Sequence, residues 1–447
     1  MDRVIALTDC NCFFASCLVV KDPSLAGKPI VVGGDPATRR GVVLAINYEA
    51  RALAAGQVRA GMPVGQAMRL LPPEVLILPP DRHLFEEVSD RFYSVLQKFS
   101  PVNERASIDE AYSDWTGCTH LFGGDPVAMA LKVKEAIRRE VGIPVSVGIG
   151  QSKIMAKMAA ELQKPDGLTM LTRDSWVKRV HPLPVGDLHG VGPKTAGKLR
   201  DLGIVTIGDL ANAHPAILTG QFGASLGLGA RRAARGEDDD PVRERRTEET
   251  KSVSNETTLS EDISDRGAQR KVLLDLADHV GARLRAHGFA GRTVNIRVRD
   301  PAFQTFTRAY TLPWPTDETN VIYHTACALL DANLEEGKPV RLLGVGVSGL
   351  DVSPRVPGQR SPSSDRPAQL SLFDLFDAGP VAMPKAQTAP DPKRRKLDEA
   401  IDAIRSKYGK DAILRLSQAS DPADKTQAGR GSEPRQGTPG ASFLGRK

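Results

Sequence analysis

Short apolar runs alternate with helical patterns along the first 171 residues of the chain. The β-prone runs are 3–8 (RVIALT), 28–33 (KPIVVG), 42–46 (VVLAI), 107–112 (SIDEAY) and 144–149 (PVSVGI). Apolar residues at helical spacing predict helices over 86–99, 127–141 and 152–164. In the run 107–112, Ile108 and Ala111 are expected to point partly inward. This alternation predicts a mixed α/β unit.

Two further regions follow with different patterns. Residues 175–240 are helical in character, with turns predicted at Gly190–Gly192 and Gly227–Gly229. Between 250 and 352, long helical patterns alternate with β-prone runs, which predicts a second mixed domain. Its predicted helices are 266–287 and 318–337, and its predicted strands are 293–299, 304–312 and 341–349.

The composition changes sharply after Asp351, where Pro, Ser, Gln, Arg and Lys dominate. Such a segment buries too little apolar area to offset chain entropy, so residues 353–447 are expected to be mostly disordered. Two apolar islands interrupt it, at 369–373 and within 396–416. The second has helical spacing and a basic start, which fits a helix that binds protein or DNA, or a weak solvated helix.

Length and composition indicate a multidomain globular protein. A chain of 447 residues suggests about three domains. With 40% hydrophobic residues, a mean hydropathy of -0.26 and no long apolar run, it is not expected to enter a membrane. No secretory signal pattern is visible at the N-terminus, so the cytoplasm is the expected compartment. The five cysteines suit neither a disulfide framework nor a zinc site.

The charge balance fits a polyanionic partner but does not require one. The formal net charge is +6 and the pI is about 9.0, yet 60 basic residues are nearly matched by 54 acidic ones. Aromatic residues make up only 5% of the chain, which disfavours binding by base stacking. If nucleic acid is bound, contacts to its backbone should dominate.

Three acids lie in or beside predicted strands. Asp9 closes the first run, while Asp109 and Glu110 are adjacent within 107–112. Neighbouring strand residues point to opposite faces, so burial of both carboxylates would need a compensating charge. Oxygen ligands without nearby His or Cys favour Mg²⁺, and two such ions about 3.5 to 4 Å apart support phosphoryl transfer. On spacing alone, ordinary exposed strand acids are the simpler interpretation.

Several motifs lie in order along roughly the first 350 residues of the chain. They are DCNCFFASC (9–17), NYEAR (47–51), SIDEAY (107–112), SVGIGQSKIMAKMAAELQKPDG (146–167), LHGVGPKTAGKLRDLGI (188–204), ARGEDDDPV (234–242), KSVSNETT (251–258) and RTVNIRVRDPAFQTFTRAYTLP (292–313). In order and separation, this set resembles the motif pattern of the Y-family of lesion-bypass DNA polymerases.

The resemblance implies an α+β multidomain, right-hand polymerase. A catalytic palm is expected at 1–12 and 80–172, and fingers at 13–79. A helical thumb with a helix-hairpin-helix is expected at 173–242, and a little finger at 243–352. It also implies a metal site in which Asp9, Asp109 and Glu110, with the main-chain carbonyl of Cys10, hold two Mg²⁺ ions.

The nucleotide site is likewise implied by the resemblance. Phe14 matches the steric gate, an aromatic ring packed where a ribose 2′-hydroxyl would lie. Tyr48, Arg51 and Lys164 match residues that hold the incoming triphosphate, and a phenol, a guanidinium and an ammonium suit phosphate oxygens. Ala45 stands where the family often has Thr, so one hydroxyl contact is expected to be missing and nucleotide affinity weaker. The stretch after Arg51 is about three residues longer than the usual pattern.

DNA contacts are expected in two regions. Gly190 and Gly192, followed by Lys194, resemble the hairpin of a helix-hairpin-helix, in which main-chain amides receive a phosphate without base readout. Without the family, a plain turn is about as good an explanation. Lys251 and Arg297 lie in or beside predicted strands of the little finger, which in the family lies along the duplex backbone.

A five-residue match in the tail implies a partner protein. Gln369, Leu370, Leu372 and Phe373 resemble the peptide by which bacterial polymerases bind the sliding clamp, with the two last residues as apolar anchors. The position just after the last predicted domain favours this interpretation over a chance match.

The resemblance therefore predicts a monomeric enzyme that binds primer-template DNA and deoxynucleoside triphosphates, and extends primers across damaged template with low fidelity. One alternative is a catalytically inactive relative that binds DNA and the clamp as a scaffold; the presence of all three acids disfavours it. Another is a nuclease or nucleotidyl cyclase with the same two-metal chemistry, which the thumb and little-finger motifs disfavour.

Overall fold

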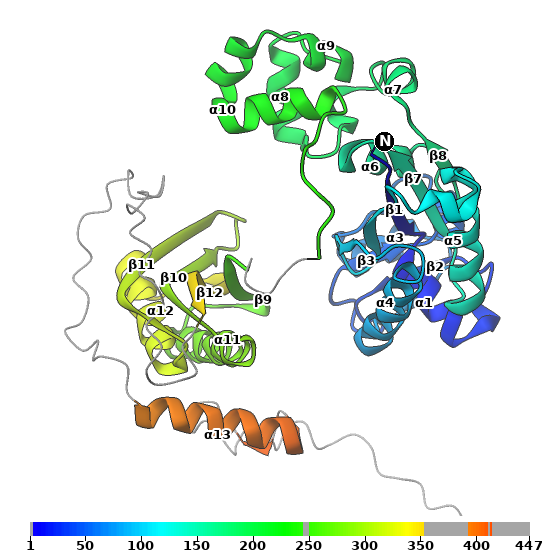
Figure 1. The fold of residues 1–447 in the computed structure, drawn as a ribbon. Helices are drawn as coiled ribbons and strands as arrows, with labels where there is room; N and C mark the ends of the chain where they lie inside the picture. The colour runs from blue at the N-terminus through cyan, green and yellow to red at the C-terminus, as the bar shows by residue number, and fades with distance from the viewer. Residues whose placement is uncertain (1–2, 245–249, 353–391, 410–411, 414–447) are drawn as a thin grey trace, which may run out of the picture. The chain divides into compact units, whose positions relative to one another are not determined.

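The structure, a computed structural model, describes residues 3–244, 250–352, 392–409 and 412–413 (Figure 1). The chain divides into two compact units, Met1–Arg245 and Arg246–Lys447. None of the helices in the described ranges is long and apolar enough to cross a membrane. The clamp-binding peptide predicted at 369–373 lies outside the described residues.

The first unit is built on a sheet with the strand order β5-β6-β1-β7-β8. β1 (Ile5–Cys10) is central and fully buried, and it pairs antiparallel with both β6 (Glu110–Asp114) and β7 (Val145–Gly150). β5 (Asn103–Arg105) and β8 (Leu168–Met170) form the edges. A continuous apolar run such as that of β1 is expected where both faces of a strand are covered.

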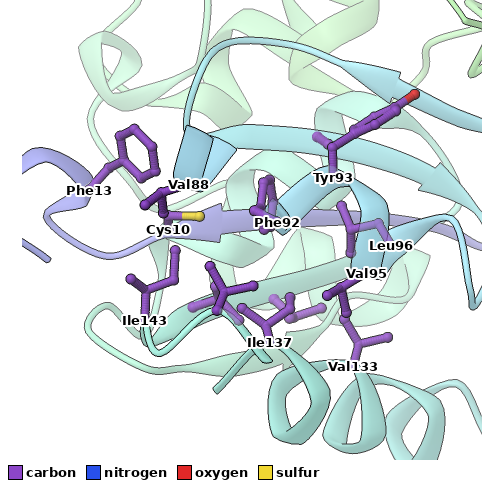
Figure 2. Packing of buried hydrophobic residues seen from close by; sticks show 14 of the residues in the cluster. Cys10, Phe13, Val88, Phe92, Tyr93, Val95, Leu96, Val133, Ile137 and Ile143 are labelled. Atoms are coloured by element: carbon purple, nitrogen blue, oxygen red, sulfur yellow. The ribbon is translucent and has the colours of Figure 1, made fainter. Parts of the chain in front are cut away.

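Helices cover both faces of this sheet, and the side chains of β1 alternate between them. Ala6 and Cys10 belong to a cluster with residues of α4 (Arg82–Leu96) and α5 (Pro126–Glu140), part of which Figure 2 shows. Ile5 and Leu7 pack instead against α6 (Lys153–Glu161). α1 (Phe13–Lys21) leaves the end of β1 directly, so its first residues stay close to Asp9.

A smaller sheet with the order β3-β2-β4 has its own apolar core. Its strands are β2 (Ile30–Gly33), β3 (Val43–Ile46) and β4 (Leu76–Leu78), and its helices are α2 (Tyr48–Leu53) and α3 (Val64–Leu70). Short 3-10 helices occur at Pro23–Leu25, Thr119–Phe122 and Val185–Asp187.

A helical region completes the first unit, with α7 (Arg173–Arg179), α8 (Pro193–Asp201), α9 (Ile207–Asn212) and α10 (Pro215–Ala234). The turn predicted at Gly227–Gly229 is wrong, because both glycines lie within α10. The helix is interrupted earlier, at Gly223, whose φ of 77° and ψ of 163° are non-helical. Gly227 is needed for packing, since a Cβ there would lie 2.6 Å from the carbonyl oxygen of Leu218.

The second unit has a sheet of order β11-β10-β12-β9 with helices on one side. Its strands are β9 (Ser252–Ile263), β10 (Phe289–Arg299), β11 (Thr305–Thr316) and β12 (Val340–Val352). Its helices are α11 (Arg266–His287), α12 (Thr319–Asn333) and α13 (Pro392–Tyr408), the last of which packs on α11. The helix expected over 396–416 thus begins earlier and ends at Tyr408.

The strand predicted over 107–112 is shorter than expected. β6 begins only at Glu110, and Asp109 precedes it in a bend. Ala111 is buried as predicted, but Ile108 is 36% exposed, so its predicted inward orientation is wrong. The sequence alternation did not show where pairing with β1 ends.

Candidate active site

Two of the three predicted acids lie side by side on the central sheet. Asp9 of β1 is the register partner of Glu110 of β6, so their side chains project from the same face of neighbouring strands. Asp9 is only 5% exposed. Asp109 lies immediately before β6, where its main-chain carbonyl accepts a hydrogen bond of 2.9 Å from the Cys10 amide. Its carboxylate accepts a hydrogen bond from the hydroxyl of Ser107.

Two lysines compensate this pair of carboxylates. Lys157 of α6 places its Nζ 3.3 Å from Asp9 Oδ2 and 2.5 Å from Glu110 Oε2. Lys164 places its Nζ 2.8 Å from Asp9 Oδ2, and both lysines also pair with Glu161. Lys164 was predicted as a triphosphate ligand, whereas Lys157 was missed, since one lysine on a helix carries no signal of its own.

Electrostatics keep both ammonium groups charged. Burial acts to lower the pKa of Lys157, but the hydrogen bond to Glu110 and the charge of Asp9 outweigh burial and raise the pKa well above its usual range. Burial likewise acts to lower the pKa of Lys164, and the hydrogen bond to Asp9 makes the net shift upward. The carboxylate pair therefore already binds positive charge.

This arrangement fits a divalent cation, but the acids are not gathered into a finished ligand set. Within the described part of the chain, no group of three His, Cys, Asp or Glu side chains is placed to hold a metal ion. Asp9 and Glu110 are nonetheless partly buried oxygen donors that require a cation, which is the donor chemistry that Mg²⁺ prefers. The Cys10 side chain is buried in the core, and burial raises the pKa of its thiol. Its main-chain carbonyl is therefore the group to consider as a ligand.

The smaller sheet presents Tyr48 and Arg51 from α2. The Arg51 guanidinium lies 5.2 Å from the centre of the Tyr48 ring, and its Nε donates to the Ile46 carbonyl at 3.1 Å. Asn47 caps α2 by accepting from the Ala50 amide and also accepts from the Ile30 amide. Burial raises the pKa of Tyr48, so its phenol stays protonated as a hydrogen-bond donor at neutral pH.

Phe14 lies at the start of α1, half-buried against an aromatic neighbour from α4. The ring centroids of Phe14 and Phe85 are 4.6 Å apart, a distance typical of favourable aromatic pairs. Phe85 therefore supports the position of the predicted gate. The sequence offered no sign of this pairing, because the two residues are far apart in the chain.

Asn11 fixes the loop that carries Lys164. Its side-chain amide donates to Ser146 Oγ at 2.9 Å, and its Oδ1 accepts from the Asp166 amide at 2.8 Å. Asn11 is 3% exposed, so these bonds satisfy a buried polar group. Only these long-range contacts show the positioning role of Asn11.

The residues predicted to contact DNA lie on both units. Gly190 has a φ of 92°, and Gly192 forms the N-cap of α8, with open space where a Cβ would stand at either position. Lys194 is exposed in the first turn of that helix. In the second unit, Lys251 is exposed just before β9, and Arg297 of β10 pairs with Glu256 at 3.0 Å.

Comparisons with known proteins agree with this geometry. The impB/mucB/samB family matches residues 8–161, its C-terminal domain matches 250–362, and the IMS family HHH motif matches 178–204. DNA polymerase IV of Moorella thermoacetica is 40% identical over 414 residues, covering 93% of this chain and 96% of that protein. DNA polymerase IV of Methanoculleus marisnigri is 41% identical over 353 residues, covering 78% of this chain and 95% of that protein.

A solved structure is also similar. A Y-family DNA polymerase chimera, Dbh-Dpo4(243-245)-Dbh, superposes with a TM-score of 0.69 at 25% identity, covering 78% of this chain and all of that one.

Fold, motifs and relatives together define an enzyme class, the nucleotidyltransferases that act on DNA. The chain belongs to the impB/mucB/samB family, the Y-family of translesion DNA polymerases. It is thus a DNA-directed DNA polymerase of a metal-dependent family, which confirms the resemblance seen in the motifs.

Proposed function

We propose that this chain adds deoxynucleotides to a primer 3′ end with two Mg²⁺ ions held by Asp9, Asp109, Glu110 and the Cys10 carbonyl. The observation that carries this proposal is the register of Asp9 against Glu110, with Asp109 immediately before Glu110 at the start of β6. When bound, the ions would activate the attacking hydroxyl and stabilise the leaving oxygen. We also propose the domain limits that the resemblance implies, with the palm at 1–12 and 80–172, the fingers at 13–79, the thumb at 173–242 and the little finger at 243–352.

The protein's own contribution is to orient and neutralise the triphosphate. Arg51 and Tyr48 offer donors from α2, and Lys164 offers an ammonium from the loop that Asn11 holds. Binding of nucleotide and metal requires Lys164 to exchange Asp9 for phosphate oxygens. Preorganised donors of this kind are the main catalytic device in phosphoryl transfer.

Primer extension tests the proposed acids directly. Wild type should extend a synthetic primer-template with Mg²⁺, whereas Asp109→Ala/Glu110→Ala should lose extension by several orders of magnitude but still bind DNA. An Asp174→Ala variant, altered at the start of α7, serves as control and should match wild type. Extension by the double variant would remove these acids from the metal site. If DNA binding is intact but even wild type is inactive with clamp present, the scaffold alternative gains support.

We propose that Phe14 excludes ribonucleotides by occupying the space of a 2′-hydroxyl. Its support by Phe85 favours a fixed ring position. Phe14→Ala should therefore admit ribonucleotides, lowering the preference for deoxynucleotides by roughly a hundredfold or more, since a steric clash is removed. Single-nucleotide insertion of matched dNTP and rNTP measures the ratio. An unchanged ratio would remove the gate role from Phe14.

We propose that residues 369–373 bind the sliding clamp. Support comes from the motif itself, with Gln369 as hydrogen-bonding residue and Leu370, Leu372 and Phe373 as apolar side chains. Deletion of these five residues should abolish stimulation of primer extension by the clamp and leave clamp-free extension unchanged. Deletion of 383–387, of the same length, is the matched control. Equal stimulation of the 369–373 deletion and wild type would contradict the clamp-binding proposal.

A further inference from the structure

The helix α13 contacts the rest of the second unit through a charged face. Arg395, Asp398, Asp402 and Arg405 point inward at helical spacing, and Ile401 is the buried apolar residue between them. The apolar residues Leu397, Ile404 and Tyr408 are instead 54%, 37% and 68% exposed. This is the reverse of an ordinary amphipathic helix, which buries its apolar stripe.

Arg285 of α11 is the centre of the contact. Its Nε lies 2.6 Å from Asp402 Oδ2 and its Nη2 lies 3.2 Å from Asp402 Oδ1, so the pair is bidentate. Its Nη1 lies 3.3 Å from Asp398 Oδ2. The side chains of Arg285 and Asp398 are 6% and 4% exposed, so both charges are removed from water and depend on each other.

Two further ion pairs flank this centre. Arg405 pairs with Asp278 of α11, and Arg395 lies 3.1 Å from Asp317, just before α12. Both acids are almost fully buried, at 3% and 5% exposure. The surface beneath α13 therefore has Arg285 between the acids Asp278 and Asp317. The facing side of α13 has the complementary order, with its two acids between Arg395 and Arg405.

α13 also completes the start of α12. The N-cap residue of α12, Glu318, makes no side-chain capping bond. Asp398 Oδ2 instead accepts a hydrogen bond of 3.0 Å from the Thr319 amide. An acidic side chain at this place satisfies a main-chain donor and interacts favourably with the helix dipole, although it comes from another helix.

We propose that the α11/α12 layer is a docking surface whose occupant is α13. We further propose that α13 acts as a latch, by which we mean a helix that binds this surface and leaves it reversibly. The contact depends on ion pairs with little apolar burial, so it is specific in register but weakened by salt. α13 contacts α11 and the start of α12, whereas Arg297 of β10 pairs with Glu256, so release of α13 should leave the proposed DNA contacts unchanged.

Hydrogen exchange of the full-length protein tests the latch without DNA or nucleotide. In wild type, amides of α13 should be protected at low salt and lose most of that protection at high salt. Arg405→Asp should lose it already at low salt, because it places an acid against Asp278. Lys407→Asp makes the same charge change at an exposed position of the same helix and should keep protection. The reversed pair Asp278→Arg/Arg405→Asp should restore it.

Protection of α13 that survives both Arg405→Asp and high salt would overturn the proposal, as would equal loss in Lys407→Asp. Amides of α11 report whether each variant retains the domain fold. Affinity for primer-template DNA should be the same for Arg405→Asp and wild type; a loss would place α13 in the DNA interface and contradict the separation of the two faces. These readouts do not depend on polymerase activity, so they can fail independently of the proposed function.

Discussion

Lys157 is the residue whose role only the folded chain makes visible. It lies between Asp9 and Glu110, although it is distant from both in sequence. The partly buried carboxylates repel each other, and the ammonium group compensates them until a cation binds. A lysine is thus as much a part of the acidic site as the acids themselves.

We expect Lys157→Met to destabilise the metal-free protein by about 1–3 kcal/mol, because two partly buried carboxylates lose a hydrogen-bonded cation. Added Mg²⁺ should recover part of this loss. Urea unfolding with chelator and with Mg²⁺ measures both effects. Lys132→Met is the matched control, since Lys132 forms an exposed pair with Glu135 that contributes little. Equal stability of Lys157→Met and wild type in chelator would show that Lys157 does not stabilise the pair.

At the scale of elements, apolar periodicity was informative where long segments bury one face. The helix predicted over 266–287 is observed as α11 with the same limits, because its buried residues recur along the whole helix. Glycine positions were a poorer guide. Gly223, Gly227 and Gly229 look alike in sequence, but only Gly223 interrupts α10, while Gly227 allows a close approach to Leu218.

The strand limits near the acids depended on pairing. β1 ends at Cys10, whose amide donates to the Asp109 carbonyl, so β1 offers no partner to the residues before Asp109. β4, β5 and β8 are so short that their residues show no periodicity. Edge strands of this kind form because a neighbouring strand offers hydrogen bonds, which the local sequence does not indicate.

At the scale of the whole molecule, both units carry exposed basic residues in places that suit a phosphate backbone. The hairpin before α8 offers main-chain amides and Lys194, and the second unit offers Lys251 and Arg297. Arg297 must exchange its partner Glu256 for a phosphate to bind DNA. Contacts of this kind position a duplex without reading its sequence.

DNA affinity should therefore fall steeply with salt, with a log-log slope of about -0.9 per phosphate neutralised. Lys194→Ala should weaken binding equally for unrelated sequences and reduce the slope by about 1. Fluorescence anisotropy over a salt series measures both quantities. Lys132→Ala, on α5 outside the HHH motif, is the comparison variant. A flat salt response in wild type would contradict backbone binding.

The sequence alone determined the family, and it predicted the order of the domains and the acids of the metal site, because motif residues keep their order and spacing whatever the fold brings together. Tertiary structure decided what those residues touch. Register placed Glu110 beside Asp9, α6 brought Lys157 between them, and α4 set Phe85 behind Phe14. These contacts join residues far apart in the chain, and burial and charge compensation, which select them, arise only once the elements pack.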